Sequence, residues 1–104
     1  MDKKQAFEIA KKYAGIVAKE FNPKQVLLFG SYFDGTPHEY SDIDIAVIFD
    51  EYKDNWWDGA ARLQSISREI DVYNIEPHLM ELEHDPSGFV HHVQKTGKVL
   101  YQKI

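Results

Sequence analysis

Two aspartates one residue apart stand at the start of an apolar run. Asp42 and Asp44 lead into the segment IDIAVIF at residues 43–49, although aspartate is depleted in strand interiors. Residues i and i+2 of a strand project to one side, so both carboxylates can converge on the same metal ions. Two carboxylates shared between two Mg²⁺ ions about 3.5–4 Å apart can clamp the attacking and leaving oxygens of an in-line displacement. For this pair alone, a loop cap and an exposed strand end are the simpler explanation.

A Gly-Ser pair ends the preceding apolar segment. Gly30 permits a sharp turn and a close approach of the backbone to a ligand, and a helical turn begun at Ser31 would aim free N–H groups at a phosphate. By itself, this pair is better explained by a turn followed by a helix cap. The combination is more specific, because Asp42 follows Ser31 by eleven residues. One hairpin-like connection can then place a phosphate-binding turn beside a metal site.

Hydrophobic periodicity predicts the elements that position these residues. Helices are predicted at residues 3–21, 55–70 and 85–96, and strands at residues 25–29, 43–49 and 72–82, with residues 99–101 forming either a last short strand or a docked segment. The segment at 43–49 is apolar on both faces after Asp44, which predicts a central strand. Pro77 predicts an edge or a bulge for the following strand. We therefore expect an α/β (α+β) fold, with a single small mixed sheet flanked by helices in one domain at residues 1–104.

Composition limits the classes of function. The 104 residues carry a net charge of −5 and show no basic cluster, which argues against long DNA or RNA as a substrate. A small polyanion that arrives with Mg²⁺ remains compatible, because the metal supplies positive charge. The chain has no cysteine, which excludes disulfides and thiolate metal sites and fits a cytoplasmic protein. The sequence contains no run of about 18 apolar residues, so it predicts no membrane span.

These motifs make the sequence resemble the nucleotidyltransferase superfamily related to DNA polymerase β, most closely its minimal nucleotidyltransferase branch. The resemblance rests on Gly30-Ser31, on Gly35 and on SDIDIAV at residues 41–47. It extends over nearly the whole chain through segments that are similar to small single-domain members, namely IEPHLM at 75–80, DPSGF at 85–89 and KTGKVLY at 95–101.

The resemblance implies a polymerase beta-like nucleotidyltransferase fold and the transfer of a nucleoside monophosphate from an NTP, with ATP expected, to an acceptor hydroxyl. Gly30 and Ser31 would bind the nucleotide phosphates, and Asp42 and Asp44 would hold two Mg²⁺ ions. It also implies a separate small helical partner of the HEPN type. That partner is either a substrate-binding subunit or a toxin, in which case this chain is an antitoxin that binds or nucleotidylates it.

The family uses a third carboxylate on a neighbouring strand, and two residues compete for that role. Asp71 stands where the second helix ends, whereas Glu76 lies inside the apolar strand. We favour Glu76, because an acid in a strand interior is harder to explain structurally, and we retain Asp71 as the alternative. His78 shares a strand face with Glu76, so it either approaches the site or is a half-buried structural histidine.

One departure from the family concerns the turn between the motifs. Relatives often carry a small residue and a Lys or Arg before the second glycine, where this chain has Phe33-Asp34. A negative charge thus replaces a positive one near the triphosphate. Weaker nucleotide binding or a changed donor preference is the expected consequence.

Overall fold

Helices and strands alternate along most of the chain. The computed structural model describes residues 3–30 and 42–104. Its elements are α1 (Lys3–Phe21), β1 (Gln25–Phe29), β2 (Ile43–Phe49), α3 (Trp56–Glu69), β3 (Ile75–Glu81), α4 (Phe89–Thr96) and β4 (Lys98–Gln102). The predicted α/β fold with one mixed sheet is therefore confirmed, and residues 98–102 form the strand that the sequence left open.

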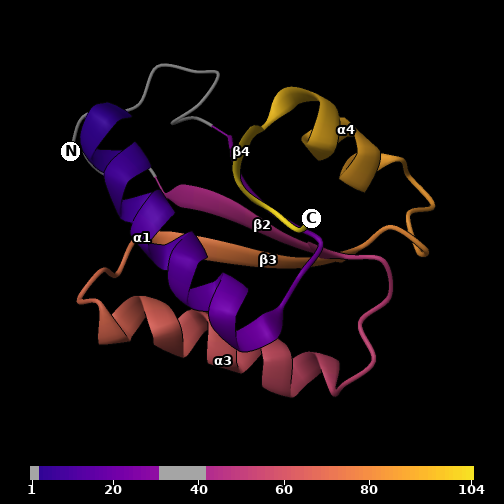
Figure 1. Cartoon of the computed structure of the whole chain (residues 1–104), viewed down its shortest axis with the longest axis horizontal. Helices are drawn as coiled ribbons and strands as arrows, with labels where there is room; N and C mark the ends of the chain where they lie inside the picture. Colours follow the sequence, from indigo (N-terminus) through magenta and orange to yellow (C-terminus); the bar gives the residue numbers. More distant parts are fainter. Residues whose placement is uncertain (1–2, 31–41) are drawn as a thin grey trace.

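The four strands form one sheet in the order β3-β2-β1-β4 (Figure 1). β1 pairs antiparallel with both β2 and β4, whereas β2 and β3 are parallel, with α3 as the crossover between them. β2 is central, as its two apolar faces predicted. β3 is an edge strand, and this position explains why Pro77 is tolerated. Proline has no backbone N–H to donate, and an edge strand forms ladder hydrogen bonds on one side only.

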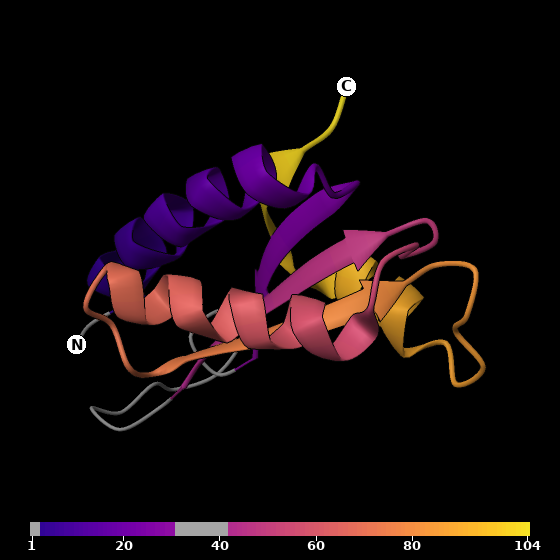
Figure 2. The same cartoon turned by 90° about the horizontal axis from the view of Figure 1, so that it is seen from below.

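The two faces of the sheet are covered by different helices. One face packs on α1 and α3 through a core that includes Tyr13, Ile45 and Leu63. The other face packs on α4, where Val90 and Val93 contact apolar residues of β1, β2 and β3. In Figure 1, α3 lies below the sheet and α4 above it, and Figure 2 shows α3 in front of the sheet with α4 behind it. Alternate residues of β2 therefore belong to two separate cores.

Local signals explain most of the helix ends. α1 ends at Asn22, which adopts a left-handed φ of 52° and donates its N–H to the Ala18 carbonyl at 3.1 Å, a conformation that asparagine tolerates better than most residues. α3 begins after Asn55, whose side chain accepts a hydrogen bond from the Asp58 N–H at 2.9 Å. α4 ends at Thr96, as predicted, and Gly97 is its C-cap.

Two predicted boundaries were wrong. The strand predicted at 72–82 forms only over Ile75–Glu81, because α3 first ends in a turn. The helix predicted from Asp85 begins at Phe89, after a turn that precedes the left-handed Gly88. Asp85 still acts on this helix, because its carboxylate accepts hydrogen bonds from the N–H groups of Val90 at 3.0 Å and His91 at 3.1 Å.

None of the helices in the described ranges is long and apolar enough to cross a membrane.

Candidate active site

The pairing of β2 with β3 brings two carboxylates together. In this parallel register Asp44 lies opposite Glu76, and His78 lies two residues further along β3 on the same face. The Nε2 atom of His78 is 3.1 Å from Oδ1 of Asp44. One ligand atom from each of the three side chains can be chosen so that all lie within 4.8 Å of one another. The sheet thus builds a compact cluster of two carboxylates and one imidazole.

The end of β1 approaches this cluster from the other side. Phe29 is paired with Asp44, and Gly30 follows it with a left-handed φ of 82°. A Cβ atom added at Gly30 would stand only 2.5 Å from Oδ2 of Asp44. The backbone conformation therefore favours glycine at this position, and a Cβ atom here would also displace the Asp44 carboxylate.

The cluster lies on the sheet face that α4 covers only in part. Ala46, Ile48 and Met80 are buried on this face under Val90 and Val93 of α4. Towards the start of β2 the cover ends: the side chains of Asp44 and His78 are 28% and 37% exposed, and Glu76 is exposed. The cluster is therefore accessible to a ligand while its strands stay anchored in the core.

Aromatic rings support the imidazole from the side of β1. The ring of Phe29 meets the ring of His78 edge to face, with centroids 5.1 Å apart, and Phe89 meets Phe29 at 6.2 Å. Such contacts restrict the side-chain orientation of a half-buried ring. His78 is thereby held with Nε2 directed at Asp44.

Only some of the predicted site residues come together in the structure. Asp44 and Glu76 come together, whereas Asp42 precedes the first residue of β2, is exposed and does not belong to the cluster of three. Gly30 lies against Asp44. Ser31 lies outside the described residues, together with Gly35 and the rest of the predicted connection at residues 32–41.

The competing acid, Asp71, stands apart from the cluster. It lies in the turn after α3, is exposed, has a left-handed φ of 61°, and accepts a hydrogen bond from the Tyr73 hydroxyl at 3.0 Å. Since Ile75 is the first residue of β3 to pair with β2, Asp71 falls before the parallel pair begins. Its conformation is that of a helix-end residue.

His78 is the residue whose position relative to the cluster the sequence left open. Its spacing from Glu76 predicted the shared face, and the structure confirms that placement. The contact with Asp44 depends on which strand lies beside β3 and in which register. The sequence pattern around His78 does not contain the pairing partner or the register of its strand.

The donor set of the cluster suits a divalent cation. Carboxylate oxygens are the ligands of hard ions such as Mg²⁺, and imidazole nitrogen is a ligand of first-row transition metals. With side chains on one open face, such a cluster leaves coordination positions for water or a substrate oxygen.

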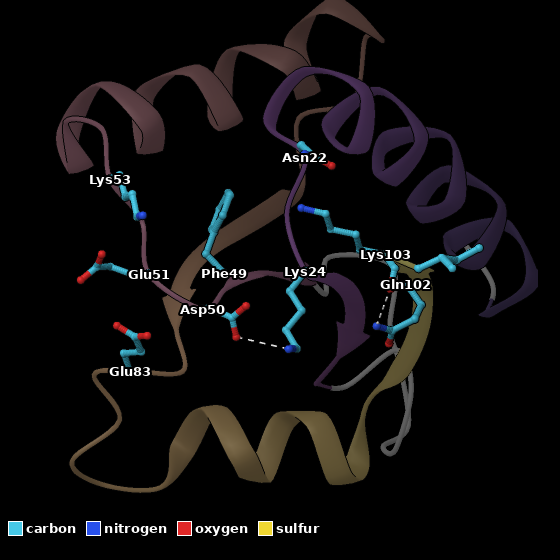
Figure 3. A pocket seen from close by; sticks show the side chains of 10 residues that line it. Asn22, Lys24, Phe49, Asp50, Glu51, Lys53, Glu83, Gln102 and Lys103 are labelled. Carbon is cyan, nitrogen blue, oxygen red and sulfur yellow. Dashed lines mark hydrogen bonds and ion pairs between the residues drawn. The ribbon is translucent and has the colours of Figure 1, made fainter.

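The surface is also hollowed elsewhere, at the opposite end of β2. A pocket of about 580 Å³ is lined by Phe49, Asp50 and residues that follow β4 and precede β1 (Figure 3). Three lysines and three acidic residues line it, and Lys24 forms an ion pair with Asp50 at 3.2 Å. Its mixed charges do not converge on a common point, so we place the candidate site at the Asp44 cluster rather than in this pocket.

Comparisons with known proteins agree on one family. Residues 11–104 match the sequence model described as Polymerase beta, Nucleotidyltransferase. The protein adenylyltransferase MntA of Aphanizomenon flos-aquae is 35% identical over 86 residues, which cover 77% of this chain and 57% of that protein. The chain spans about half the length of the curated relatives it matches.

Solved structures show the same fold. A crystal structure of a toxin-antitoxin with AMP-PNP has 29% identity and a TM-score of 0.63, and the match covers 89% of this chain and 73% of that one. A tri-AMPylated HEPN toxin of Shewanella oneidensis in complex with an MNT antitoxin matches with 24% identity and a TM-score of 0.57, over 93% of this chain and 73% of that one. The second likeness shows the fold alone.

Proposed function

This chain belongs to the polymerase beta nucleotidyltransferase family, and we propose that it transfers the AMP group of ATP to a hydroxyl group of a helical HEPN-type partner protein. The observation that carries the proposal is the meeting of Asp44 with Glu76 across the parallel strands, beside the left-handed Gly30. This arrangement places two carboxylates beside a backbone turn on an open face of the sheet. A metal-bound triphosphate needs carboxylates to bind the metal and a backbone turn to bind its phosphates.

In this proposal Asp42, Asp44 and Glu76 are the metal ligands. Asp44 is the shared residue, since Asp42 precedes it by two positions and Glu76 lies opposite it on β3. Two Mg²⁺ ions bound by these carboxylates would neutralise the triphosphate and stabilise the attacking and leaving oxygens. The chain's own contribution is position: β2 is anchored in both cores, so Asp44 is held in place before the substrate arrives.

The reaction is a substitution at phosphorus. The acceptor oxygen forms a bond to the α-phosphorus of ATP, and the bond between that phosphorus and the oxygen bridging to the β-phosphate breaks. The products are an AMP ester, pyrophosphate and the proton lost by the acceptor hydroxyl. Because Glu76 is exposed, a hydroxyl on the surface of another protein can reach the ligand side of the site.

Gly30 and Ser31 are proposed to bind the nucleotide phosphates. The left-handed Gly30 brings the chain close to Asp44, so phosphate bound by the next backbone N–H would lie beside the metal ligands. The serine hydroxyl would donate one further hydrogen bond. Asp34 carries a negative charge in the loop that follows, and we expect it to weaken triphosphate binding relative to a lysine or arginine.

The donor and the acceptor are inferred from relatives. MntA of Aphanizomenon flos-aquae is a protein adenylyltransferase, and the toxin-antitoxin with 29% identity was crystallised with AMP-PNP, an ATP analogue. These relatives support ATP over other nucleotides and a protein over a small molecule as acceptor. The AMPylated HEPN toxin seen with an MNT antitoxin is a precedent for the kind of partner.

A second candidate function is an antitoxin that acts by binding alone. The structural matches with toxin-antitoxin complexes favour a stable partner. The two functions differ in one respect that can be measured, which is whether masking of the partner requires transfer of AMP.

The test combines the purified protein, a candidate HEPN-type partner protein, Mg²⁺ and ATP labelled at the α-phosphate. We expect label on the partner, no transfer of label from γ-labelled ATP, and a mass increase of the partner that corresponds to AMP. Asp44→Asn should abolish the transfer, whereas Asp50→Asn, at the opposite end of β2, should not. The other three nucleotides, labelled in the same way, test the preference for ATP.

Two results would contradict the proposal. Transfer that persists in Asp44→Asn would remove the carboxylate assignment. Complete masking of the partner by Asp44→Asn, without any transfer by the unchanged protein, would favour the binding function instead.

A further inference from the structure

We propose that His78 is a direct ligand of the metal ion held by Asp44 and Glu76, and that it gives this position a preference for Mn²⁺ or a similar nitrogen-accepting ion over Mg²⁺. The inference rests on the proposed function for the presence of a metal site. It adds His78 as a third ligand and a preference for a class of metal ion that the carboxylates alone would not favour.

The geometry is the first argument. Nε2 of His78 is 3.1 Å from Oδ1 of Asp44, and a ligand atom of Glu76 lies within 4.8 Å of ligand atoms of both. An ion at about 2.0–2.2 Å from each ligand needs donor atoms no more than about 4.4 Å apart, which the His78–Asp44 pair already satisfies. The three side chains come from adjacent parallel strands, so a small side-chain rotation, rather than a backbone movement, is enough to surround an ion.

The second argument is that the imidazole is held at this place. Phe29 packs edge to face against the ring of His78, and Phe29 is itself contacted by Phe89 of α4. His78 is 37% exposed, so the ring is packed on one side while Nε2 meets Asp44. A solvated surface histidine would lack both restraints.

The third argument concerns the choice of metal. Mg²⁺ strongly prefers oxygen ligands, whereas the affinity of sites with nitrogen ligands rises from Mn²⁺ along the first transition series. A position with two carboxylates and one imidazole therefore disfavours Mg²⁺ relative to a position with carboxylates only. Asp42 and Asp44 can still hold Mg²⁺ with the nucleotide, so the two metal positions would differ in their preferred ion.

The test is metal binding by the full chain after removal of metals with a chelator, without nucleotide. Mn²⁺ is titrated and followed by its electron paramagnetic resonance, and pulsed measurements detect coupling of the electron spin to a directly bound ¹⁴N nucleus. We expect ¹⁴N coupling in the unchanged protein and none in His78→Ala, with Mn²⁺ affinity lower by about ten- to a hundredfold. His84→Ala, which alters an exposed histidine in the turn beyond β3, should leave both signals unchanged.

A second variant separates a ligand from a structural residue. His78→Asp replaces the nitrogen by a carboxylate oxygen, so Mn²⁺ should still bind, the ¹⁴N coupling should disappear, and Mg²⁺ should compete with Mn²⁺ better than it does in the unchanged protein. Circular dichroism of each variant establishes that it is folded. Mn²⁺ bound without ¹⁴N coupling in the unchanged protein, or an unaltered Mn²⁺ affinity in folded His78→Ala, would overturn the inference.

The outcome is separable from that of the proposed function. If AMP transfer occurs and depends on Asp44 but no ¹⁴N coupling is seen, the inference fails and the function stands. If ¹⁴N coupling is seen but no nucleotide is transferred to the partner, the metal site stands and the proposed function fails.

Discussion

Gly30 and Asp44 occupy adjacent space at the ends of two paired strands, and a Cβ atom on residue 30 would come within 2.5 Å of the Asp44 carboxylate. The left-handed φ of 82° at Gly30 adds a second restriction. The turn after β1 and the carboxylate on β2 are therefore coupled. A side chain at residue 30 would displace the Asp44 carboxylate.

Gly30→Ala is the direct test of this coupling. We expect a loss of about 1–2 kcal/mol of stability from the left-handed conformation, and a loss of Mn²⁺ binding and AMP transfer because Asp44 must rotate away. Gly15→Ala is the matched control, because its added Cβ meets nothing within 4 Å. In the middle of α1 it should stabilise by about 0.5–1 kcal/mol. Urea unfolding and the transfer assay measure the two effects separately, and a fully active Gly30→Ala would contradict the coupling.

Two matched amide substitutions can decide which residue is the third carboxylate ligand. Glu76→Gln should lower AMP transfer by at least about 100-fold, since even residues outside the ligand shell of a metal cost 10–100-fold when they are changed. Asp71→Asn should keep near-normal activity, because Asp71 lies in the turn before the parallel pair begins. The reverse order of the two activities would assign the role to Asp71.

A buried hydroxyl joins the two helices of one face. Tyr13 is fully buried and donates its hydroxyl proton to the Leu63 carbonyl at 2.7 Å, and burial raises the pKa of this phenol. We expect Tyr13→Phe to lower the free energy of unfolding by about 1 kcal/mol, the usual net value of one hydrogen bond. Tyr73→Phe, at a residue that is 74% exposed, should change it by less than about 0.5 kcal/mol. Equal effects of the two substitutions in urea unfolding would contradict this account.

A surface ion pair predicts a pH dependence. Hydrogen bonds from Arg62 of α3 to the carboxylate of Glu20 on α1 hold the pKa of Glu20 below its ordinary value of 4.5. A carboxyl with a lowered pKa in the folded state contributes stability above its unfolded pKa, and the contribution is lost as the pH falls through the folded value. Stability should therefore decrease below about pH 4.5, and Arg62→Gln should remove this part of the decrease.

The effect should be small, because the pair is exposed and screened by salt. Unfolding midpoints measured at pH 7 and pH 3.5, at low and at high salt, provide the check. A difference between Arg62→Gln and the unchanged protein that grows towards low pH would contradict the sign of the prediction.

The sequence alone determined the elements and the family. The strands at 25–29 and 43–49 and the helix at 3–21 form with the predicted bounds, because their periodicity is strong and Pro23 interrupts the chain between the helix and the first strand. The resemblance to minimal nucleotidyltransferases rested on short motifs, and the family match over residues 11–104 confirms it. The roles of Gly30, Ser31, Asp42, Asp44 and Glu76 stay predictions for the experiments above.

The turn that precedes α4 shows why some boundaries could not be predicted. Asp85-Pro86 has the composition of a helix start, yet the helix begins at Phe89. The carboxylate of Asp85 reaches the N–H groups of residues 90 and 91 across the turn. A local rule assigns such a residue to the cap position, whereas its hydrogen bonds extend further along the chain.

Only the tertiary structure decided which side chains meet. Asp44, Glu76 and His78 are separated by 34 positions from first to last in the sequence, and no local pattern states that their strands are parallel neighbours in a register that aligns the first two. A shift by one residue would turn one carboxylate to the opposite face. Residue types and spacing thus specify what each strand carries, and the pairing of β2 with β3 specifies that the carboxylates and the imidazole share one site.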